Sequence, residues 1–255
     1  MALEIHQFPC LSDNFGVLIH DTERGVTASI DAPNADSVRA ALKEKGWKLS
    51  YIFTTHHHAD HTDGNKALKA ETGCVIIGPK AEEAKIPGID TAVVEGSAFR
   101  LGSYQVQVIE TPGHTNGHIT FYIPAANVAF VGDTLFALGC GRVIEGSMEM
   151  MWNSLAKLAA LPANTQIYCG HEYTLANAKF ALTIEPENAS LVARAAEIEA
   201  LRKTGQATLP TRIDVELATN PFLRVKSPAI RKRLGLDIAP DWKVFAEVRE
   251  RKNRA

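Results

Sequence analysis

The sequence predicts an α+β protein in which β-sheet layers covered by helices are followed by a smaller helical region. Short strand-like runs alternate with helical patterns through the first ~170 residues, which is typical of sheets with helices packed on them. The strand signal then fades from Tyr173 onward. With 255 residues, 45% of them hydrophobic and 22% charged, the chain can bury a full core. These observations together predict one large domain and one small one.

The expected elements follow from short apolar runs and from helical spacing. Helices are expected at residues 35–45 and 63–70, and two more, dense in Ala, Leu, Glu and Arg, at 187–203 and 242–251. We place the domain boundary after residue 172, which gives a larger domain over 1–172 and a smaller helical domain over 173–255. Without an internal repeat or a low-complexity linker, the two parts should pack together. The expected strands cover residues 5–8, 15–19, 26–30, 51–54, 74–77, 104–110, 119–123, 128–131 and 167–169.

A cluster of metal-binding residue types follows the apolar run Tyr51–Phe53. Residues 54–64 read TTHHHADHTDG and place His56, His58, Asp60 and His61 within six positions. Neutral imidazole and carboxylate are ligands of borderline divalent metals, and four of them on one turn are too many for a single open catalytic site. The cluster therefore predicts two metal ions.

Three later residues repeat one arrangement, a short strand followed by a glycine and then a candidate ligand. They are His114, Asp133 and His171. Ligands at the ends of buried strands can converge on one edge of a sheet, whereas a solvated histidine loop would not require matching sites downstream. Because a carboxylate has two donor oxygens, Asp133 is the natural bridge between ions ~3.5–4 Å apart.

The other polar residues near the cluster are assigned different roles. Alternate side chains of an extended segment point in opposite directions, so His57 should face away from its neighbours and serve the structure. Asp63 precedes an expected helix and is favoured as its N-cap. His118, which begins the alternating stretch at 119–123, is expected to form hydrogen bonds rather than bind metal. His6 and His20 are treated as ordinary strand residues.

These motifs resemble the metallo-β-lactamase superfamily, and within it the whole chain resembles the glyoxalase II (hydroxyacylglutathione hydrolase) family. The ligand string THHHADH at 55–61 is specific for the superfamily and says little about the substrate. The family resemblance depends on later strings, namely GDTLF at 132–136, GCGR at 139–142, CGHEY at 169–173 and TNPFLR at 219–224.

The resemblance implies a four-layer αββα metallo-β-lactamase sandwich with a small C-terminal α-helical domain. It implies that residues 1–172 form the catalytic domain and that the helical domain over 173–255 binds substrate. It also implies a ligand set of seven residues. One ion would be held by His56, His58 and His114, the other by Asp60, His61 and His171, with Asp133 between them. Zinc is the expected metal, although ligands of this type also accept iron or manganese.

The activity implied by the resemblance is hydrolysis of S-D-lactoylglutathione to D-lactate and glutathione, the second step of methylglyoxal detoxification. Two ions would lower the pKa of a water between them, and the resulting bridging hydroxide would attack the thioester carbonyl. Asp60 and Asp133 are the expected catalytic carboxylates. A thiol with a pKa near ~8.5 leaves as thiolate without a dedicated general acid, which suits a thioester.

The same resemblance assigns residues that contact the glutathione part of the substrate. Two of these residues, Arg249 and Lys252, stand at positions i and i+3 of a helix, so their positive charges share one face and suit an anionic peptide. Ile144 departs from the family pattern, since an aromatic hydroxyl is often found there, and this puts one expected hydrogen bond in doubt. The expected substrate-binding residues are Arg142, His171, Tyr173, Arg249 and Lys252.

Two rival functions are weighed against the charge distribution and the number of candidate ligands. Residues 222–255 contain ten Lys or Arg against four acids, a local net charge of +6, so the preceding 221 residues carry −8 of the total of −2. A nuclease would use this cationic segment to bind phosphates, but aromatic residues are scarce in it and the whole chain is acidic. A glutathione persulfide dioxygenase of the same superfamily would use one iron and would have little need of Asp60 and His61.

The remaining expectations concern location, partners and cysteines. No apolar stretch reaches the ~18 residues that span a bilayer, and the start MALEIH lacks the features of a signal peptide, so we expect a cytoplasmic monomer without nucleic-acid or membrane partners. Cys10, Cys74, Cys140 and Cys169 form no Cys-x-x-Cys motif. Buried packing is their expected role, although Cys140 and Cys169 adjoin proposed site segments.

Overall fold

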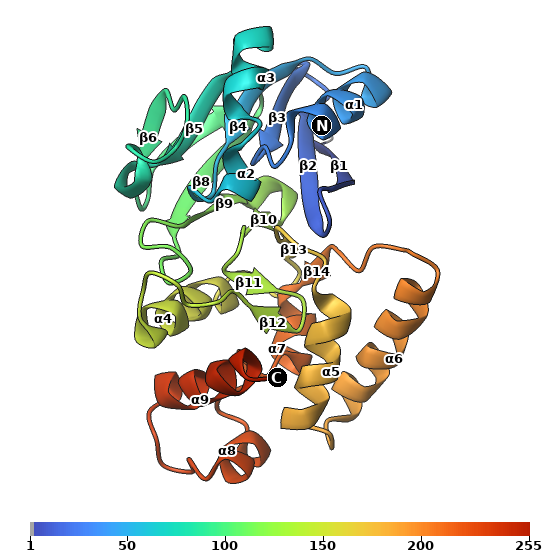
Figure 1. Ribbon diagram of the computed structural model, residues 1–255, viewed down its shortest axis with the longest axis vertical. Helices are drawn as coiled ribbons and strands as arrows, with labels where there is room; N and C mark the ends of the chain where they lie inside the picture. Colours follow the sequence, from blue (N-terminus) through green and yellow to red (C-terminus); the bar gives the residue numbers. More distant parts are fainter. Residues whose placement is uncertain (1–2) are drawn as a thin grey trace. The chain divides into compact units, whose positions relative to one another are not determined.

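The computed structural model describes residues 3–255, which form two compact units (Figure 1). The first unit extends as far as Glu110 and also includes Thr115–Gly132. The second contains Thr111–His114 and Asp133–Ala255. The chain therefore leaves and re-enters each unit close to the expected ligands His114 and Asp133.

The first unit contains a mixed sheet in which the strand order follows the chain order. Its first three strands are antiparallel and the next three are added in parallel. The strands are β1 (Leu3–Cys10), β2 (Asn14–Asp21), β3 (Val26–Ile30), β4 (Leu49–Phe53), β5 (Val75–Pro79) and β6 (Thr91–Val93).

Helices α1 (Ala35–Lys45) and α3 (Asn65–Thr72) pack on this sheet through one apolar cluster. Val38 and Leu68, one from each helix, are fully buried within it. The side chain of Asn34 accepts a hydrogen bond from the backbone of Ser37 and so caps the start of α1. The short helices α2 (Ala59–Thr62) and η1 (Lys80–Glu82) lie in the connections after β4 and β5.

A second, antiparallel sheet in the first unit faces the mixed sheet. It contains β7 (Ala98–Leu101), β8 (Tyr104–Glu110), β9 (Ile119–Ile123) and β10 (Val128–Phe130), with η2 (Pro124–Ala126) before β10. The rings of Phe53 on β4, Phe99 on β7 and Phe121 on β9 meet between the sheets, with centroids 5.1–6.2 Å apart. A buried Phe of this kind contributes about 1.5–3 kcal/mol through the hydrophobic effect.

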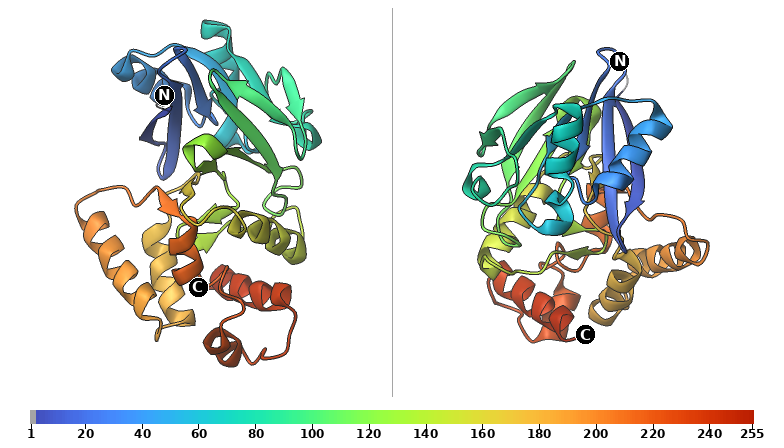
Figure 2. Two further views of the ribbon diagram at one scale, coloured as in Figure 1. Left: turned by 180° about the vertical axis from the view of Figure 1, so that it is seen from behind. Right: turned by 45° about the horizontal axis from the view of Figure 1, so that its top comes forward.

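The second unit is mainly helical. Helices α5 (Thr174–Ile184) and α6 (Ala189–Lys203) lie side by side (Figures 1 and 2) and share a core with Leu138. The ring of Trp152 on α4 contacts that of Phe245 on α9 at 6.2 Å. The other elements are β11 (Leu135–Phe136), β12 (Gly139–Cys140), α4 (Met148–Ala159), β13 (Gln166–Tyr168), β14 (Thr211–Arg212), α7 (Ile213–Thr219), α8 (Pro228–Leu234) and α9 (Asp241–Asn253).

Most expected elements are confirmed, with boundaries that shift by one or two residues. The assignment of Asp63 as an N-cap is wrong, because Asp63 ends α2 while Gly64 occupies the cap position of α3 without a side-chain bond. The alternation expected from Ile119 to Ile123 is also wrong, since every residue of β9 is buried. Within residues 3–255, no helix is long and apolar enough to cross a membrane.

Candidate metal centre

The first cluster, defined as His56, His58, Asp60 and His61, lies where β4 ends and α2 begins. Nε2 of His56 is 3.2 Å from Nδ1 of His58. Nε2 of His61 is 3.6 Å from Oδ2 of Asp60, and a donor atom of His61 lies within 4.8 Å of one of His56. The strand end and the single helical turn thus gather four candidate metal ligands of the first unit.

Asp31 orients two histidines of this cluster. Its Oδ2 accepts hydrogen bonds from Nδ1 of His61 (2.7 Å) and from Oγ1 of Thr55 (2.9 Å), and its Oδ1 accepts the backbone N–H of Thr55 (2.7 Å). Because the Thr55 hydroxyl donates to Asp31, it accepts from Nδ1 of His56, 3.0 Å away. Both imidazoles therefore carry their proton on Nδ1, and Nε2 bears the lone pair that a metal requires.

Asp31 is a further residue of the candidate site, which the sequence alone did not identify. It follows the apolar strand β3 directly, so it shares with the expected ligands a position close to the end of a strand. Its backbone has a φ of 54°, in the left-handed region that Asp and Asn adopt more readily than most residues. The strand-then-polar pattern could have identified Asp31, although its partners could not be read from spacing.

Burial differs sharply within the first cluster. His56 and His61 are 0% and 1% exposed, whereas 41% of the Asp60 side chain is accessible. Nδ2 of Asn14 donates to Oδ2 of Asp60 at 3.1 Å and to its backbone carbonyl at the same distance, which fixes the carboxylate despite its exposure. A candidate ligand that is held yet accessible suits a site that substrate must reach.

His57 turns toward a buried carboxylate, in keeping with the structural role expected for it. Its Nδ1 lies 2.9 Å from Oε2 of Glu82, which also accepts the His57 backbone N–H at 2.7 Å. The other oxygen of Glu82 accepts the N–H of Gly117 at 2.9 Å. The ring of His118 stacks on that of His56, with centroids 4.8 Å apart. Glu82, another residue not identified from the sequence, thus braces the ligand segment.

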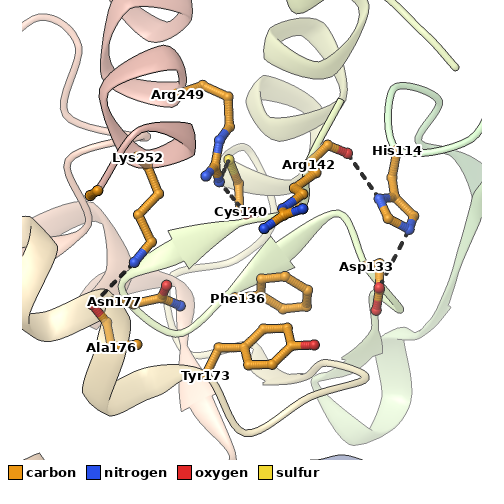
Figure 3. A pocket seen from close by; sticks show the side chains of 12 residues that line it. His114, Asp133, Phe136, Cys140, Arg142, Tyr173, Ala176, Asn177, Arg249 and Lys252 are labelled. Carbon is orange, nitrogen blue, oxygen red and sulfur yellow. Dashed lines mark hydrogen bonds and ion pairs between the residues drawn. The ribbon is translucent and has the colours of Figure 1, made fainter. Parts of the chain in front are cut away.

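The second cluster, defined as His114, Asp133 and His171, lies in the second unit. Oδ2 of Asp133 is 3.4 Å from Nε2 of His114 and 3.3 Å from Nε2 of His171. Nδ1 of His114 donates to the carbonyl of Arg142 at 2.9 Å, so its Nε2 carries the lone pair (Figure 3). The ring of Tyr173 stacks on that of His171, with centroids 4.7 Å apart.

Two glycines near Asp133 lie so close to neighbouring atoms that a side chain would not fit. A Cβ at Gly132, where φ is 45°, would lie 2.6 Å from both Nε2 of His118 and Oγ1 of Thr55. A Cβ at Gly141 would lie 1.9 Å from the carbonyl oxygen of Asp133. Only glycine therefore permits these close approaches.

The chemistry of both donor sets fits divalent metal ions. Each cluster combines imidazole with carboxylate, and hydrogen bonds fix the tautomers of His56, His61 and His114 so that Nε2 can bind metal. Neither set contains a thiolate, so both suit ions that bind nitrogen and oxygen ligands.

A pocket of about 550 Å³ adjoins the second cluster within the same unit (Figure 3). His114 and Asp133 form part of its wall, together with Phe136 and Tyr173. Arg142, Arg249 and Lys252 line it as well. Three cations around one cavity favour an anionic ligand. Asn177, which also lines the pocket, was not expected from the sequence.

Arg249 and Lys252 hold their positions through contacts inside the second unit. Arg249 is only 5% exposed, and its Nη1 donates to the carbonyl of Cys140 at 2.9 Å. Nζ of Lys252 donates to the carbonyl of Ala176 at 3.2 Å, and burial, followed by the charge of Arg249, lowers the pKa of Lys252. A bound carboxylate would oppose both effects on that pKa. Ile144 is 58% exposed and does not line the pocket.

The cysteines are expected to be unreactive in the folded protein. All four are buried and free, and burial raises the pKa of Cys140 to about 11 and that of Cys169 further. Since the thiolate is the reactive form, a thiol whose pKa is raised stays protonated and inert at pH 8. Labelling with a chromogenic disulfide reagent at pH 8 should be slow in native protein and should reach four thiols in denaturant. Rapid labelling of native Cys140 would contradict this.

Comparisons with known proteins give a consistent result over the whole chain. Residues 26–171 match the family described as the metallo-β-lactamase superfamily, and residues 172–255 match the hydroxyacylglutathione hydrolase C-terminus. A relative from Brucella anthropi named hydroxyacylglutathione hydrolase is 60% identical over 98% of this chain and 96% of its own length. One of the same name from Mesorhizobium japonicum is 59% identical over 99% of both chains.

Solved structures agree on the fold. The crystal structure of ETHE1 from Myxococcus xanthus has a TM-score of 0.67 and 25% sequence identity, over 99% of this chain and 98% of that chain. Together with the superfamily match, this confirms the expected fold class, a metallo-β-lactamase sandwich with a C-terminal helical region. The domain boundary after residue 172 stays a prediction, and the compact units divide the chain elsewhere.

Proposed function

Because the chain belongs to the hydroxyacylglutathione hydrolase family of the metallo-β-lactamase superfamily, we propose that it hydrolyses S-D-lactoylglutathione to D-lactate and glutathione. One structural observation supports this substrate above others. Two residues of the second cluster, His114 and Asp133, line the same pocket as three cations. An anionic substrate held by those cations would have its reacting group beside candidate metal ligands.

The proposed metal ligands are those expected from the sequence. We propose that two divalent ions, zinc above iron or manganese, are shared by all seven residues of the first and second clusters, with Asp133 as the bridge. The support is the donor chemistry of each cluster and the family membership of the chain. When bound, such ions supply a nucleophile from water at neutral pH and polarise the substrate carbonyl.

The chain's own residues are proposed to bind the substrate and to orient it. Asp60, held by Asn14 and accessible from solvent, would act with Asp133 as a catalytic carboxylate. Tyr173 presents its ring against His171 at the pocket, where it would pack on the glutathione chain together with Arg142. The departing thiol, with a pKa near ~8.5, needs no proton donor, which fits a site built of ligands and binding groups.

Removing the two cations of α9 should weaken substrate binding. Replacing Arg249 and Lys252 together with Ala is expected to raise KM about tenfold or more with a smaller effect on kcat, because a remote anchor contributes mainly uniform binding. Steady-state kinetics on lactoylglutathione would measure KM and kcat separately. Arg251, a cation of the same helix paired with Glu247, provides a control whose replacement by Ala should leave KM unchanged. An unchanged KM in the double variant would remove both residues from the substrate site.

The proposed activity is tested by one assay on purified protein with its metals counted. Hydrolysis of S-D-lactoylglutathione should exceed that of acyl thioesters without glutathione, since these lack the charges that the pocket cations bind. Oxygen uptake with glutathione persulfide, tested in parallel, should be absent. Oxygen uptake without thioester hydrolysis would instead support a dioxygenase, a function that the close relatives do not favour.

The physiological setting belongs to the same proposal. We propose that the enzyme acts in the cytoplasm on a small polar substrate, without nucleic-acid or membrane partners, and that it is a monomer. Cell fractionation and light scattering would test the two parts of this proposal separately.

A further inference from the structure

The β11–β12 hairpin turns through Ala137 and Leu138, between the paired residues Phe136 and Gly139. Leu138 has a φ of 56°, in the left-handed region, and Ala137 does not. A positive φ at the second central position alone is the sign pattern of a type II turn, which favours glycine there. A leucine keeps this conformation only where its surroundings hold it.

The peptide group that joins Ala137 to Leu138 is held at both of its polar atoms. Nδ2 of Asn177, on α5, donates to the Ala137 carbonyl at 3.1 Å. The N–H of Leu138 donates to Oε2 of Glu216, on α7, at 2.8 Å. Because each bond requires one orientation of the peptide, the pair prevents the rotation that would relieve the positive φ.

Asn220 completes this arrangement and gives the TNPFLR motif a structural task. Its Nδ2 donates to the Gly139 carbonyl and to Oε2 of Glu216, both at 2.9 Å. Oε1 of Glu216 accepts the hydroxyl of Thr211 at 2.6 Å. Glu216 and Asn220 are fully buried and Asn177 is 6% exposed. We define Asn177, Glu216 and Asn220 as the hairpin clamp.

The hairpin is part of the substrate pocket. Phe136 and Cys140 line the cavity, Arg142 lies two residues beyond β12, and Asp133 lies two residues before β11. The carbonyl of Cys140 also accepts a hydrogen bond from the guanidinium of Arg249 (Figure 3). A rotation of the turn would therefore displace groups on several sides of the pocket.

We propose that the hairpin clamp sets the shape of the pocket and thereby its affinity for the substrate, with Glu216 as a positioning residue that does not itself touch substrate. This inference rests on the proposed function for its kinetic readout. Without the Glu216 carboxylate, the Leu138 N–H loses its buried acceptor, so the peptide rotates toward another partner and Leu138 returns to negative φ.

The test compares three variants in the full-length, metal-loaded protein. Glu216→Ala removes the acceptor. Glu216→Gln keeps an amide oxygen for Leu138 and Asn220 and an NH₂ for the Thr211 hydroxyl, and burial already raises the pKa of Glu216, so a neutral side chain is a close substitute. Glu185→Ala is the matched control, because Glu185 is a 3% exposed carboxylate of the same unit, paired with Arg224, that holds no part of the pocket.

Glu216→Ala is expected to raise KM for lactoylglutathione about tenfold while kcat changes less, as displaced binding groups would. Glu216→Gln should restore KM to within about twofold of wild type, and Glu185→Ala should lower Tm without moving KM. A crystal structure of Glu216→Ala should show Leu138 at negative φ. Should this variant fail to fold, Gly139→Ala serves instead, because its Cβ would lie 2.4 Å from Nδ2 of Asn177 and displace that side chain.

The proposal is overturned by a wild-type KM in folded Glu216→Ala, by an equal rise of KM in Glu185→Ala, or by Leu138 keeping its positive φ without the carboxylate. Failure of the proposed function gives a different result, in which wild type itself does not hydrolyse lactoylglutathione. The conformation of Leu138 would still decide whether the clamp holds the turn.

Discussion

Replacing Asp133 with Ala is expected to abolish thioester hydrolysis and to remove bound metal. Asp133 lies 3.4 Å and 3.3 Å from the imidazoles of His114 and His171, so its loss removes the only carboxylate that we assign to that cluster. Metal-ion catalysis contributes several kcal/mol, which corresponds to a fall in kcat of about 10³-fold or more. Elemental analysis after dialysis, together with steady-state kinetics, would measure both losses.

The matched control for Asp133 is Asp21, a buried carboxylate of the first unit. Asp21 is 1% exposed and accepts the backbone N–H groups of Glu23 and Ser103. Its replacement by Ala should cost about 1–3 kcal/mol of stability and leave the metal content unchanged. Full activity in the Asp133 variant would exclude Asp133 from the metal site.

The second large effect is expected from Asp31→Asn, a substitution that preserves shape and tolerates the φ of 54°. The Asn amide would place a donor against Nδ1 of His61 where a carboxylate oxygen now accepts. His61 would then move its proton to Nε2 and could no longer offer that nitrogen as a ligand. Metal affinity should fall about 10–100-fold, as it does when the partner of a ligating histidine is lost.

Metal titration followed by calorimetry would measure this change independently of activity. Asp90→Asn provides the control, because Asp90 accepts the backbone N–H of Ile76 in the same unit and contacts none of the expected ligands. That variant should lose stability and keep its metal affinity. Wild-type affinity in Asp31→Asn would contradict the orienting role of Asp31.

The sequence singled out the candidate ligands because metal binding limits the usable residue types. Histidines and carboxylates placed directly after apolar strands stand out from the background, and the structure gathers them into two clusters, one in each unit. Strands were equally clear where a buried strand is a short apolar run, as in β10. Whether the two clusters share their ions stays a prediction.

The hydrogen-bond partners of the supporting residues could not be predicted in the same way. Asp31 and Glu82 beside the candidate ligands, and Glu216 beside the β11–β12 hairpin, form buried hydrogen bonds to groups 24–78 positions away, which no local pattern encodes. The N-cap assigned to Asp63 failed because α2 inserts an extra helical turn immediately before α3. Hydrogen bonds between residues far apart in the sequence therefore determine the contacts of the supporting residues, which periodicity and spacing do not reveal.

The central claim is that seven residues from two clusters bind two divalent ions and that both ions are needed for thioester hydrolysis. The most direct measurement is titration of metal-free protein with zinc, with bound metal counted by elemental analysis and lactoylglutathione hydrolysis recorded at each step. The account predicts that hydrolysis reaches its maximum only when two ions are bound per chain. Maximal hydrolysis with one ion per chain, or with none, would contradict it.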